Sequence, residues 1–273
     1  MRNTRSIIII GISSDIGLAL ARRWLKRGWK IFGTYRKKTP AIKDLEDSRV
    51  GLVSCDTSDS SSVRKASNAL KRLCPTWDVL VMSVGLLEPI SPFTEVNFDE
   101  WENSLKTNFT SQIRLVHNLL PTRGIKSDLG PCVLFFSGGG INNATVNFSA
   151  YTISKIATIK MCELLDAEIS DTRFVSVGPG WVKTKIHNQI IEAGSKAGEN
   201  YQRTLEKFRV GDFTPMERVL DCCDWVINAS KKIVSGRNFN VTHDNWGDKK
   251  LEKELVREPN LFKLRKFGTI KET

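Results

Sequence analysis

The sequence lacks any long run of apolar residues. No stretch of its 273 residues approaches the roughly 20 consecutive apolar side chains that a membrane-spanning helix requires. The apolar run "IIII" near the N-terminus is far too short for a secretory signal. We therefore expect a cytoplasmic protein with no membrane partner.

Metal-binding patterns are also missing from the sequence. It contains three histidines and six cysteines, with no CxxC pair and no spacing typical of a zinc site. We therefore expect no metal site, and we expect reduced thiols that pack in the interior. The cysteines are Cys55, Cys74, Cys132, Cys162, Cys222 and Cys223.

Acidic residues are fewer than basic ones, at 30 against 41, which gives a formal net charge of +11 and a pI near 9.4. Such a surplus favours anionic partners: nucleic acid, acidic lipid headgroups or phosphate-bearing small molecules. A solvated basic surface is the simpler explanation unless the charge clusters. Because the sequence has no aromatic-plus-basic stacking motif and no recognition-helix signature, we expect no nucleic-acid partner.

Short apolar segments alternate with longer amphipathic segments along the whole chain. Most apolar segments are continuous, which is typical of parallel strands that are covered on both faces. The expected strands are 6–11, 30–35, 49–56, 77–85, 131–138, 173–180 and 236–242, and the expected helices are 15–28, 59–73, 98–120, 150–170 and 215–230. This alternation predicts an α/β fold with a Rossmann-type doubly wound parallel sheet of about seven strands and helices on both faces.

We expect a single domain over residues 1–273, with two segments that depart from the alternation. Residues 185–214 look like a helical insertion with the glycine-containing middle "EAGSKAGEN". The tail 249–273 is charged with scattered apolar residues, so it is either a surface arm or a packing element.

The segment "GISSDIG" follows the first expected strand and opens a helix. Ligands of open α/β sheets bind beyond the carboxyl ends of the strands. Gly11 permits a sharp turn and Gly17 permits close helix packing. Ser13 and Ser14 can bind phosphate at the helix N-terminus. Asp15 stands where another glycine is usual, and we expect it to cap the free N–H groups, at the cost of a negative charge near the phosphates.

The second expected strand ends in "GTYRKK", which contains no acid. Sites that prefer NAD place an acid there to bind the ribose 2′-hydroxyl. Here Arg36 follows Tyr35, and Lys37 and Lys38 follow Arg36, which suits a 2′-phosphate. We therefore favour NADP(H) as cofactor, with NAD(H) as the alternative, and an exposed basic turn is the non-binding interpretation.

The segment "YTISK" places Tyr151 and Lys155 on one face of an expected helix. That pair is common by chance, and three other residues strengthen it. Ser137 closes an apolar strand, Asn108 lies in an amphipathic helix, and Thr184 follows "GPGWVK" where it can reach a cofactor head group.

This set of residues suggests proton transfer at a carbonyl or alcohol oxygen. A free tyrosine has a pKa of about 10, and a nearby Lys155 ammonium together with a cationic nicotinamide would lower that value toward neutrality. Tyr151 could then exchange a proton with the oxygen while hydride moves at carbon. Ser137 would hydrogen-bond the oxygen, and Asn108 would hold a water that relays protons to Lys155.

Together these motifs resemble the short-chain dehydrogenase/reductase family, in its compact single-domain branch, over nearly the whole chain. The resemblance implies a Rossmann fold, an oxidoreductase with a nicotinamide cofactor, and a homodimer or homotetramer that pairs through the helices at 98–120 and 150–170. It implies a catalytic tetrad of Asn108, Ser137, Tyr151 and Lys155. It implies that the cofactor contacts are Gly11, Ser13, Ser14, Asp15, Ile16, Gly17, Tyr35, Arg36, Asp56, Thr57, Ser83, Val84, Gly85, Tyr151, Lys155, Pro179, Gly180, Val182 and Thr184.

Three positions depart from the pattern of that family. Asp15 replaces the central glycine of the first loop. The usual Asn-Asn-Ala-Gly after the fourth strand reads "MSVG", so only Gly85 is kept. Ser137 lies one residue further from Tyr151 than is common, and glycines 138–140 could absorb the extra residue.

The leading hypothesis is an NAD(P)-dependent ketone/alcohol oxidoreductase that acts on a small molecule, with residues 185–214 as its substrate lid. The mild basic bias of that segment would suit an anionic substrate, and a solvated helix explains the bias equally well. The alternatives are a sugar-nucleotide epimerase or dehydratase of the extended branch, and a catalytically idle dinucleotide sensor.

Overall fold

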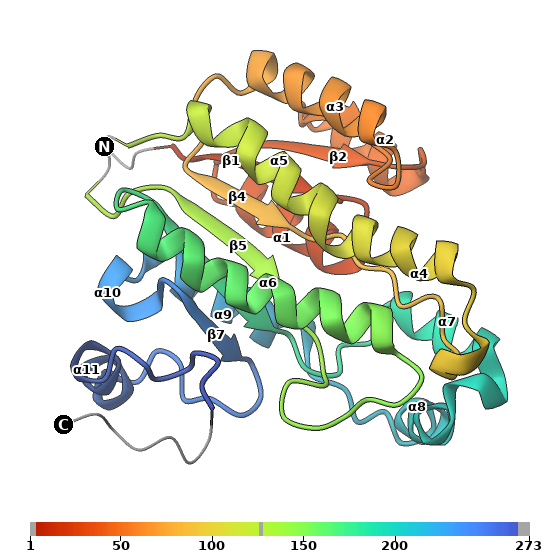
Figure 1. The fold of residues 1–273 in the computed structure, drawn as a ribbon. Helices are drawn as coiled ribbons and strands as arrows, with labels where there is room; N and C mark the ends of the chain where they lie inside the picture. Colours follow the sequence, from red (N-terminus) through yellow and green to blue (C-terminus); the bar gives the residue numbers. More distant parts are fainter. Residues whose placement is uncertain (1–3, 126–127, 267–273) are drawn as a thin grey trace.

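A parallel seven-stranded sheet forms the centre of the computed structural model, which describes residues 4–125 and 128–266. The strands are β1 (Ser6–Ile10), β2 (Lys30–Tyr35), β3 (Gly51–Ser54), β4 (Val79–Met82), β5 (Cys132–Phe136), β6 (Arg173–Gly178) and β7 (Arg237–Asn240). Their order is β3-β2-β1-β4-β5-β6-β7, and all neighbours are parallel. The chain winds outward in both directions from the β1/β4 junction (Figure 1). The prediction of a doubly wound parallel sheet is confirmed.

Helices cover both faces of the sheet (Figure 1). One face packs against α3 (Ser60–Leu73), α5 (Ser111–Leu119) and α6 (Ser149–Glu168), and the other against α1 (Asp15–Lys26) and α9 (Met216–Asn228). Side chains alternate along a strand, so Ile8 and Ile10 of β1 join the first cluster while Ile7 and Ile9 join the second. A strand that is buried on both faces needs a continuous apolar run, which explains the four isoleucines.

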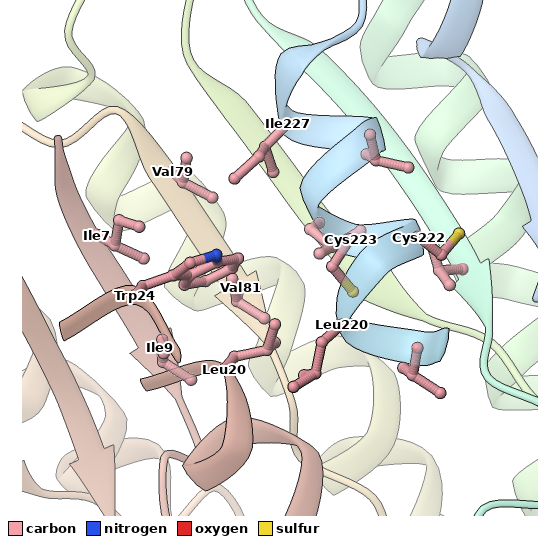
Figure 2. Close-up of a cluster of buried hydrophobic side chains, with 14 of the residues drawn as sticks. Ile7, Ile9, Leu20, Trp24, Val79, Val81, Leu220, Cys222, Cys223 and Ile227 are labelled. Atoms are coloured by element: carbon pink, nitrogen blue, oxygen red, sulfur yellow. The ribbon is translucent and has the colours of Figure 1, made fainter. Parts of the chain in front are cut away.

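The cysteines are structural residues of these clusters. Figure 2 shows Cys222 and Cys223 on α9, beside Leu220 and across from Trp24 of α1. All six cysteines are buried free thiols. Burial raises the pKa of Cys55 to about 11 and that of Cys74 to about 12, so these thiols are protonated and unreactive at neutral pH.

Several helical segments differ from the sequence prediction, and the short helix α10 (Lys231–Val234) was not expected. The expected helix 98–120 consists of α4 (Phe98–Leu105), a π-helical turn (Lys106–Thr110) and α5. The helix α2 (Pro40–Asp47) was also not predicted from the sequence. Thr39 caps its first turn, and it buries only Ile42 and Leu45. Two apolar anchors in eight residues give too weak a periodic signal to be recognised.

The segment 185–214 is helical, as predicted. It contains α7 (Ile186–Ala193), a 3₁₀ turn (Gly194–Ala197) and α8 (Glu199–Val210). Gly194 and Gly198 have φ values of 55° and 57°, which the glycine-containing middle of the segment makes accessible.

The described part of the C-terminal tail is a packing element rather than a surface arm. The helix α11 (Lys249–Arg257) buries Leu255 completely, and Leu261 and Phe262 pack on the same cluster. The buried Arg237 donates hydrogen bonds to the carbonyls of Leu255 and Leu261, which ties the tail to β7. Residues 267–273 of the predicted tail lie outside the described residues. No helix in the described ranges is long and apolar enough to cross a membrane.

Candidate active site

A cleft of about 1810 Å³ lies beyond the carboxyl ends of the strands. This volume exceeds the range of about 300–1,000 Å³ that is typical of single small-molecule pockets, so it can hold a dinucleotide together with a substrate. Every residue that the sequence analysis assigned to the site lines the cleft, except Gly17 and Asn108. The cleft residues from that set are Gly11, Ser13, Ser14, Asp15, Ile16, Tyr35, Arg36, Asp56, Thr57, Ser83, Val84, Gly85, Ser137, Tyr151, Lys155, Pro179, Gly180, Val182 and Thr184.

The loop between β1 and α1, residues 11–14, has the features of an anion-binding turn, and we refer to it as the phosphate loop. Gly11 adopts a φ of 78°, and a side chain there would collide with Val84 at 2.8 Å. A Cβ on Gly17 would lie 2.7 Å from the Gly11 carbonyl oxygen, so this glycine allows α1 to pack against the turn, as predicted. The N–H groups of Asp15 and Ile16 open the helix, where no intrahelical acceptor exists, and both residues line the cleft.

The structure corrects the role predicted for Asp15. Ser14 is the N-cap, and its hydroxyl accepts a hydrogen bond from the Gly17 N–H. The Asp15 carboxylate instead accepts a hydrogen bond of 2.7 Å from the backbone N–H of Lys185. The N-cap position is already filled by Ser14, and the Asp15 side chain, one position further along, reaches the beginning of segment 185–214.

The end of the second strand lies beside the phosphate loop, and the Gly11 N–H donates to the Thr34 hydroxyl at 3.0 Å. Arg36 is exposed and forms no ion pair among the described residues, whereas Lys38 pairs with Glu46 at 2.8 Å. Hydrogen bonds from Ser58 hold the pKa of Asp56 below its usual value, with a smaller contribution from the positive charge of Arg36. Arg36 is therefore a cation that is available to a ligand.

The "MSVG" segment braces the phosphate loop through a serine. The hydroxyl of Ser83, just after β4, lies 2.6 Å from the hydroxyl of Ser14. Although this segment departs from the family pattern, Ser83 links the end of β4 directly to the start of α1.

Tyr151 and Lys155 occupy one face of α6 at the wall of the cleft. The Lys155 ammonium donates to the Phe136 carbonyl at 2.9 Å and lies 5.5 Å from the Tyr151 ring centroid. Burial lowers the pKa of Lys155 to about 8 and raises that of Tyr151 to about 12. Desolvation of the phenol is the cause of the raised pKa, so the phenol carries its proton at neutral pH and can donate it. The predicted lowering of this pKa depends on a cationic nicotinamide as well as on Lys155, and it stays a prediction.

The neighbour of the phenol at the end of β5 is Gly138 rather than Ser137. A Cβ on Gly138 would lie 2.5 Å from the Tyr151 hydroxyl. The buried Ser137 hydroxyl donates to Asn238 of β7 at 2.7 Å, so its one proton is engaged on another side. The structure therefore differs from the prediction that Ser137 hydrogen-bonds the reacting oxygen, because consecutive residues leaving a strand point in opposite directions.

Asn108 lies in the π-helical turn between α4 and α5, behind the cleft wall. Its amide oxygen accepts from the Leu86 N–H at 2.9 Å, and its amide nitrogen donates to the Leu86 carbonyl at 2.7 Å and to Ser104 at 3.2 Å. Both amide donors are thus engaged. The side chain braces the segment after β4, and only its oxygen could accept a further bond, from a water.

Comparison with known proteins places this site in a family. The family model described as short chain dehydrogenase matches residues 5–194. The chain belongs to the short-chain dehydrogenase family. Its sequence is 25% identical over 236 residues to that of a serine 3-dehydrogenase of Rhizobium radiobacter. The aligned region covers 84% of this chain and 90% of that protein.

Solved short-chain dehydrogenase structures share the fold. One from Saccharomyces cerevisiae superposes with a TM-score of 0.77 at 21% identity, covering 90% of this chain and 98% of that one. A second, from Shigella flexneri and complexed with NADP, gives 0.71 at 20% identity and covers 88% of this chain and 97% of that one.

Members of the short-chain dehydrogenase family are oxidoreductases that bind NAD(P), and the cleft fits such a cofactor. Side chains at Gly11 and Gly17 would collide with the turn that shapes the phosphate loop, and Asp15 and Ile16 present free N–H groups there. No group of three potential metal ligands occurs in the ranges that the structure describes.

The sequence analysis missed several cleft residues of this short-chain dehydrogenase. They include Gly138 beside the phenol, Lys185 beside Asp15, and Gln189, which accepts a hydrogen bond from the Leu87 N–H at 2.8 Å. The run of three glycines after Ser137 could have indicated that a glycine lies beside the phenol. The contacts of Lys185 and Gln189 join residues more than a hundred positions apart, at separations of 170 and 102, so no local pattern announces them.

Proposed function

We propose that the protein is an NADPH-dependent carbonyl reductase acting on a small-molecule ketone or aldehyde. The observation that carries this proposal is the placement of the protonated Tyr151 phenol and the buried Lys155 ammonium in the same cleft as a free helix N-terminus. A proton donor at one end of a dinucleotide-sized cleft suits reduction of a carbonyl better than oxidation of an alcohol, which needs a phenolate.

Tyr151 donates its proton to the carbonyl oxygen as the alcohol forms. Bound NADPH supplies the hydride. Lys155 stabilises the phenolate that remains, because its ammonium lies close to the ring. Asn108 holds the segment after β4 in place through its two bonds to Leu86. Ser137 takes no part in the proton transfer, because its hydroxyl donates a hydrogen bond to the Asn238 side chain.

Arg36 supports NADPH over NADH. It lines the cleft at the end of β2 and has no acidic partner at ion-pair distance in the described residues. A guanidinium suits the 2′-phosphate through two parallel hydrogen bonds. The solved relative from Shigella flexneri that contains NADP has the same fold.

The cofactor preference is tested by Arg36→Ala. We expect the Kd for NADPH to rise about tenfold or more, because a charge-assisted bond to phosphate contributes about 1.5–3 kcal/mol. The Kd for NADH should change less than twofold. Fluorescence titration with both nucleotides measures this, and Lys37→Ala is the matched control because Lys37 is exposed outside the cleft. An equal loss for both nucleotides would contradict the assignment.

The substrate end of the cleft carries a cation with no acidic partner at ion-pair distance in the described ranges. The Arg203 guanidinium on α8 stacks on the Trp181 ring with its carbon 5.2 Å from the ring centroid, and both residues line the cleft. We propose that this fixed charge favours substrates with an anionic group, such as a carboxylate or phosphate.

A homodimer or homotetramer completes the proposal, assembled through the outer faces of α4 and α6. Phe98 on α4 is 54% exposed, and Ile153 and Leu164 on α6 are 48% and 45% exposed. Apolar side chains of this size gathered on two neighbouring helices suit an interface. Sedimentation of the purified protein measures the state, and a monomer at micromolar concentration would contradict it.

The activity itself is tested by following NADPH and NADH oxidation against a panel of carbonyl compounds, with anionic and neutral members. We expect turnover with NADPH, faster for anionic ketones. Tight NADPH binding without turnover of any member would contradict the reductase proposal and indicate a dinucleotide sensor.

A further inference from the structure

Asp15 joins the phosphate loop to the beginning of the lid. Its Oδ2 accepts the Lys185 backbone N–H at 2.7 Å, and its Oδ1 lies 3.8 Å from the Lys185 ammonium. The Asp15 side chain is 27% exposed and the Lys185 side chain 77% exposed. The Asp15 carboxylate is thus partly covered, whereas the Lys185 ammonium lies in solvent.

Several hydrogen bonds hold the lid, residues 185–214, against the walls of the cleft, and at its far end the Thr214 N–H donates to the Trp181 carbonyl at 2.8 Å. Gln189 of α7 accepts from the Leu87 N–H at 2.8 Å, and the Asn147 amide donates to the Lys196 carbonyl at 2.9 Å. Within the part of the chain that the structure describes, the hydrogen bond from the Lys185 N–H to Asp15 is the one that joins the lid to the loop that would hold the cofactor phosphates. Lys185 directly precedes α7, so it sets where the first lid helix starts.

Capping of α1 does not explain the acid. Ser14 already caps the helix, and the N–H groups of Asp15 and Ile16 stay available to a ligand. A carboxylate at this place repels a pyrophosphate by about 1 kcal/mol or more at a few ångströms, even in a water-like dielectric. A residue that weakens cofactor binding therefore needs a compensating role, and the contact with Lys185 provides one.

We propose that Asp15 is a lid-positioning residue that couples the start of α7 to the phosphate loop. The inference deepens the proposed function, because it rests on residues 185–214 covering a substrate in the same cleft. The carboxylate oxygen fixes the Lys185 N–H, and the nearby ammonium offsets part of the negative charge that a dinucleotide would meet.

Hydrogen exchange tests the contact directly in the unliganded protein. In Asp15→Ala, peptides covering 182–193 should exchange at least about fivefold faster, because the Lys185 N–H loses its acceptor. In Asp15→Asn, exchange should stay within twofold of wild type, because the amide oxygen still accepts. Asp44→Ala is the control, because this substitution removes the same negative charge from an exposed acid that lies away from the lid. Unchanged exchange in Asp15→Ala, or equal acceleration in Asp15→Asn, would overturn the proposal.

Unchanged exchange in β1 and β4 peptides shows that the variants fold. A general rise in exchange in Asp15→Ala would overturn a specific lid role.

Two further readouts separate this inference from the proposed function. NADPH should bind about threefold or more tightly to both Asp15→Asn and Asp15→Ala, because both remove the charge. With the best carbonyl substrate, KM should rise at least about fivefold in Asp15→Ala and less than twofold in Asp15→Asn. A KM that is equal in the two variants would overturn the positioning role. Failure of every variant and of wild type to bind NADPH would refute the proposed function while leaving the exchange result intact.

Discussion

At the end of β5, the residue next to the Tyr151 hydroxyl is Gly138, although the sequence pattern predicted Ser137 at this place. Gly138 lies against the Tyr151 hydroxyl, and Ser137 is turned to Asn238 of β7. Spacing along the chain gives the distance between a serine and a tyrosine but not the side of the strand end that the serine faces. The pair Tyr151 and Lys155 could be predicted, because i and i+4 share a face in any helix.

The assignment of Ser137 gives a prediction for Ser137→Ala. We expect kcat to change less than about threefold, since its hydroxyl does not serve the reacting oxygen, and stability to fall by about 1 kcal/mol from the lost bond to Asn238. Steady-state kinetics and denaturant unfolding measure the two effects. A fall in kcat of more than about a hundredfold, the size seen when an oxyanion donor is removed, would contradict this geometry.

The protonation states of the two α6 residues give a prediction for the pH dependence of reduction. Burial lowers the pKa of Lys155 to about 8, so its charge is present below pH 8 and is lost above it. Burial raises the pKa of Tyr151 to about 12, so the proton that the reaction needs stays on the phenol throughout. The single-turnover rate should therefore be flat below about pH 8 and decline above it.

Single-turnover NADPH oxidation at a series of pH values measures this profile. A rate that rises steadily into alkaline solution would indicate that the phenolate acts as a base, contrary to the assignment.

At the scale of elements, the long amphipathic segments could be predicted and the short or irregular ones could not. The 20-residue α6 presents a sustained apolar pattern, whereas α2 has eight residues and two anchors. The π-helical turn at Lys106–Thr110 cannot be recognised in the hydrophobic periodicity of the sequence, because it shifts the helix by a single residue. The role of the tail stayed open, because its few apolar residues fit exposure and packing equally well.

The packing of α11 predicts a large effect for Leu255→Ala. Leu255 is 0% exposed in the cluster under β7, so its truncation should lower the free energy of unfolding by about 2–5 kcal/mol. The neighbouring Val256 is 55% exposed, and Val256→Ala should change it by less than about 0.5 kcal/mol. Urea unfolding of both variants measures the difference, and equal effects would indicate that the helix does not dock in solution.

At the scale of the whole molecule, the doubly wound sheet follows from strand–helix alternation, and the position of the cleft follows from the sheet. Ligands gather where strand order reverses, here at β1 and β4, and the phosphate loop leaves β1 at that point. Several basic side chains that contribute to the net charge of +11 line the cleft, among them Arg36 at the end of β2 and Arg203 on α8. Composition gives the sign of this charge but not its position.

In the proposed reaction, Tyr151 supplies the proton for an NADPH-dependent reduction. The most direct measurement is the single-turnover rate of NADPH oxidation in Tyr151→Phe, with the best carbonyl substrate of the panel and NADPH affinity measured alongside. We expect a rate about 10²–10⁴-fold lower, the usual contribution of general acid catalysis, with the NADPH Kd within twofold of wild type. A rate close to wild type at unchanged NADPH affinity would contradict it.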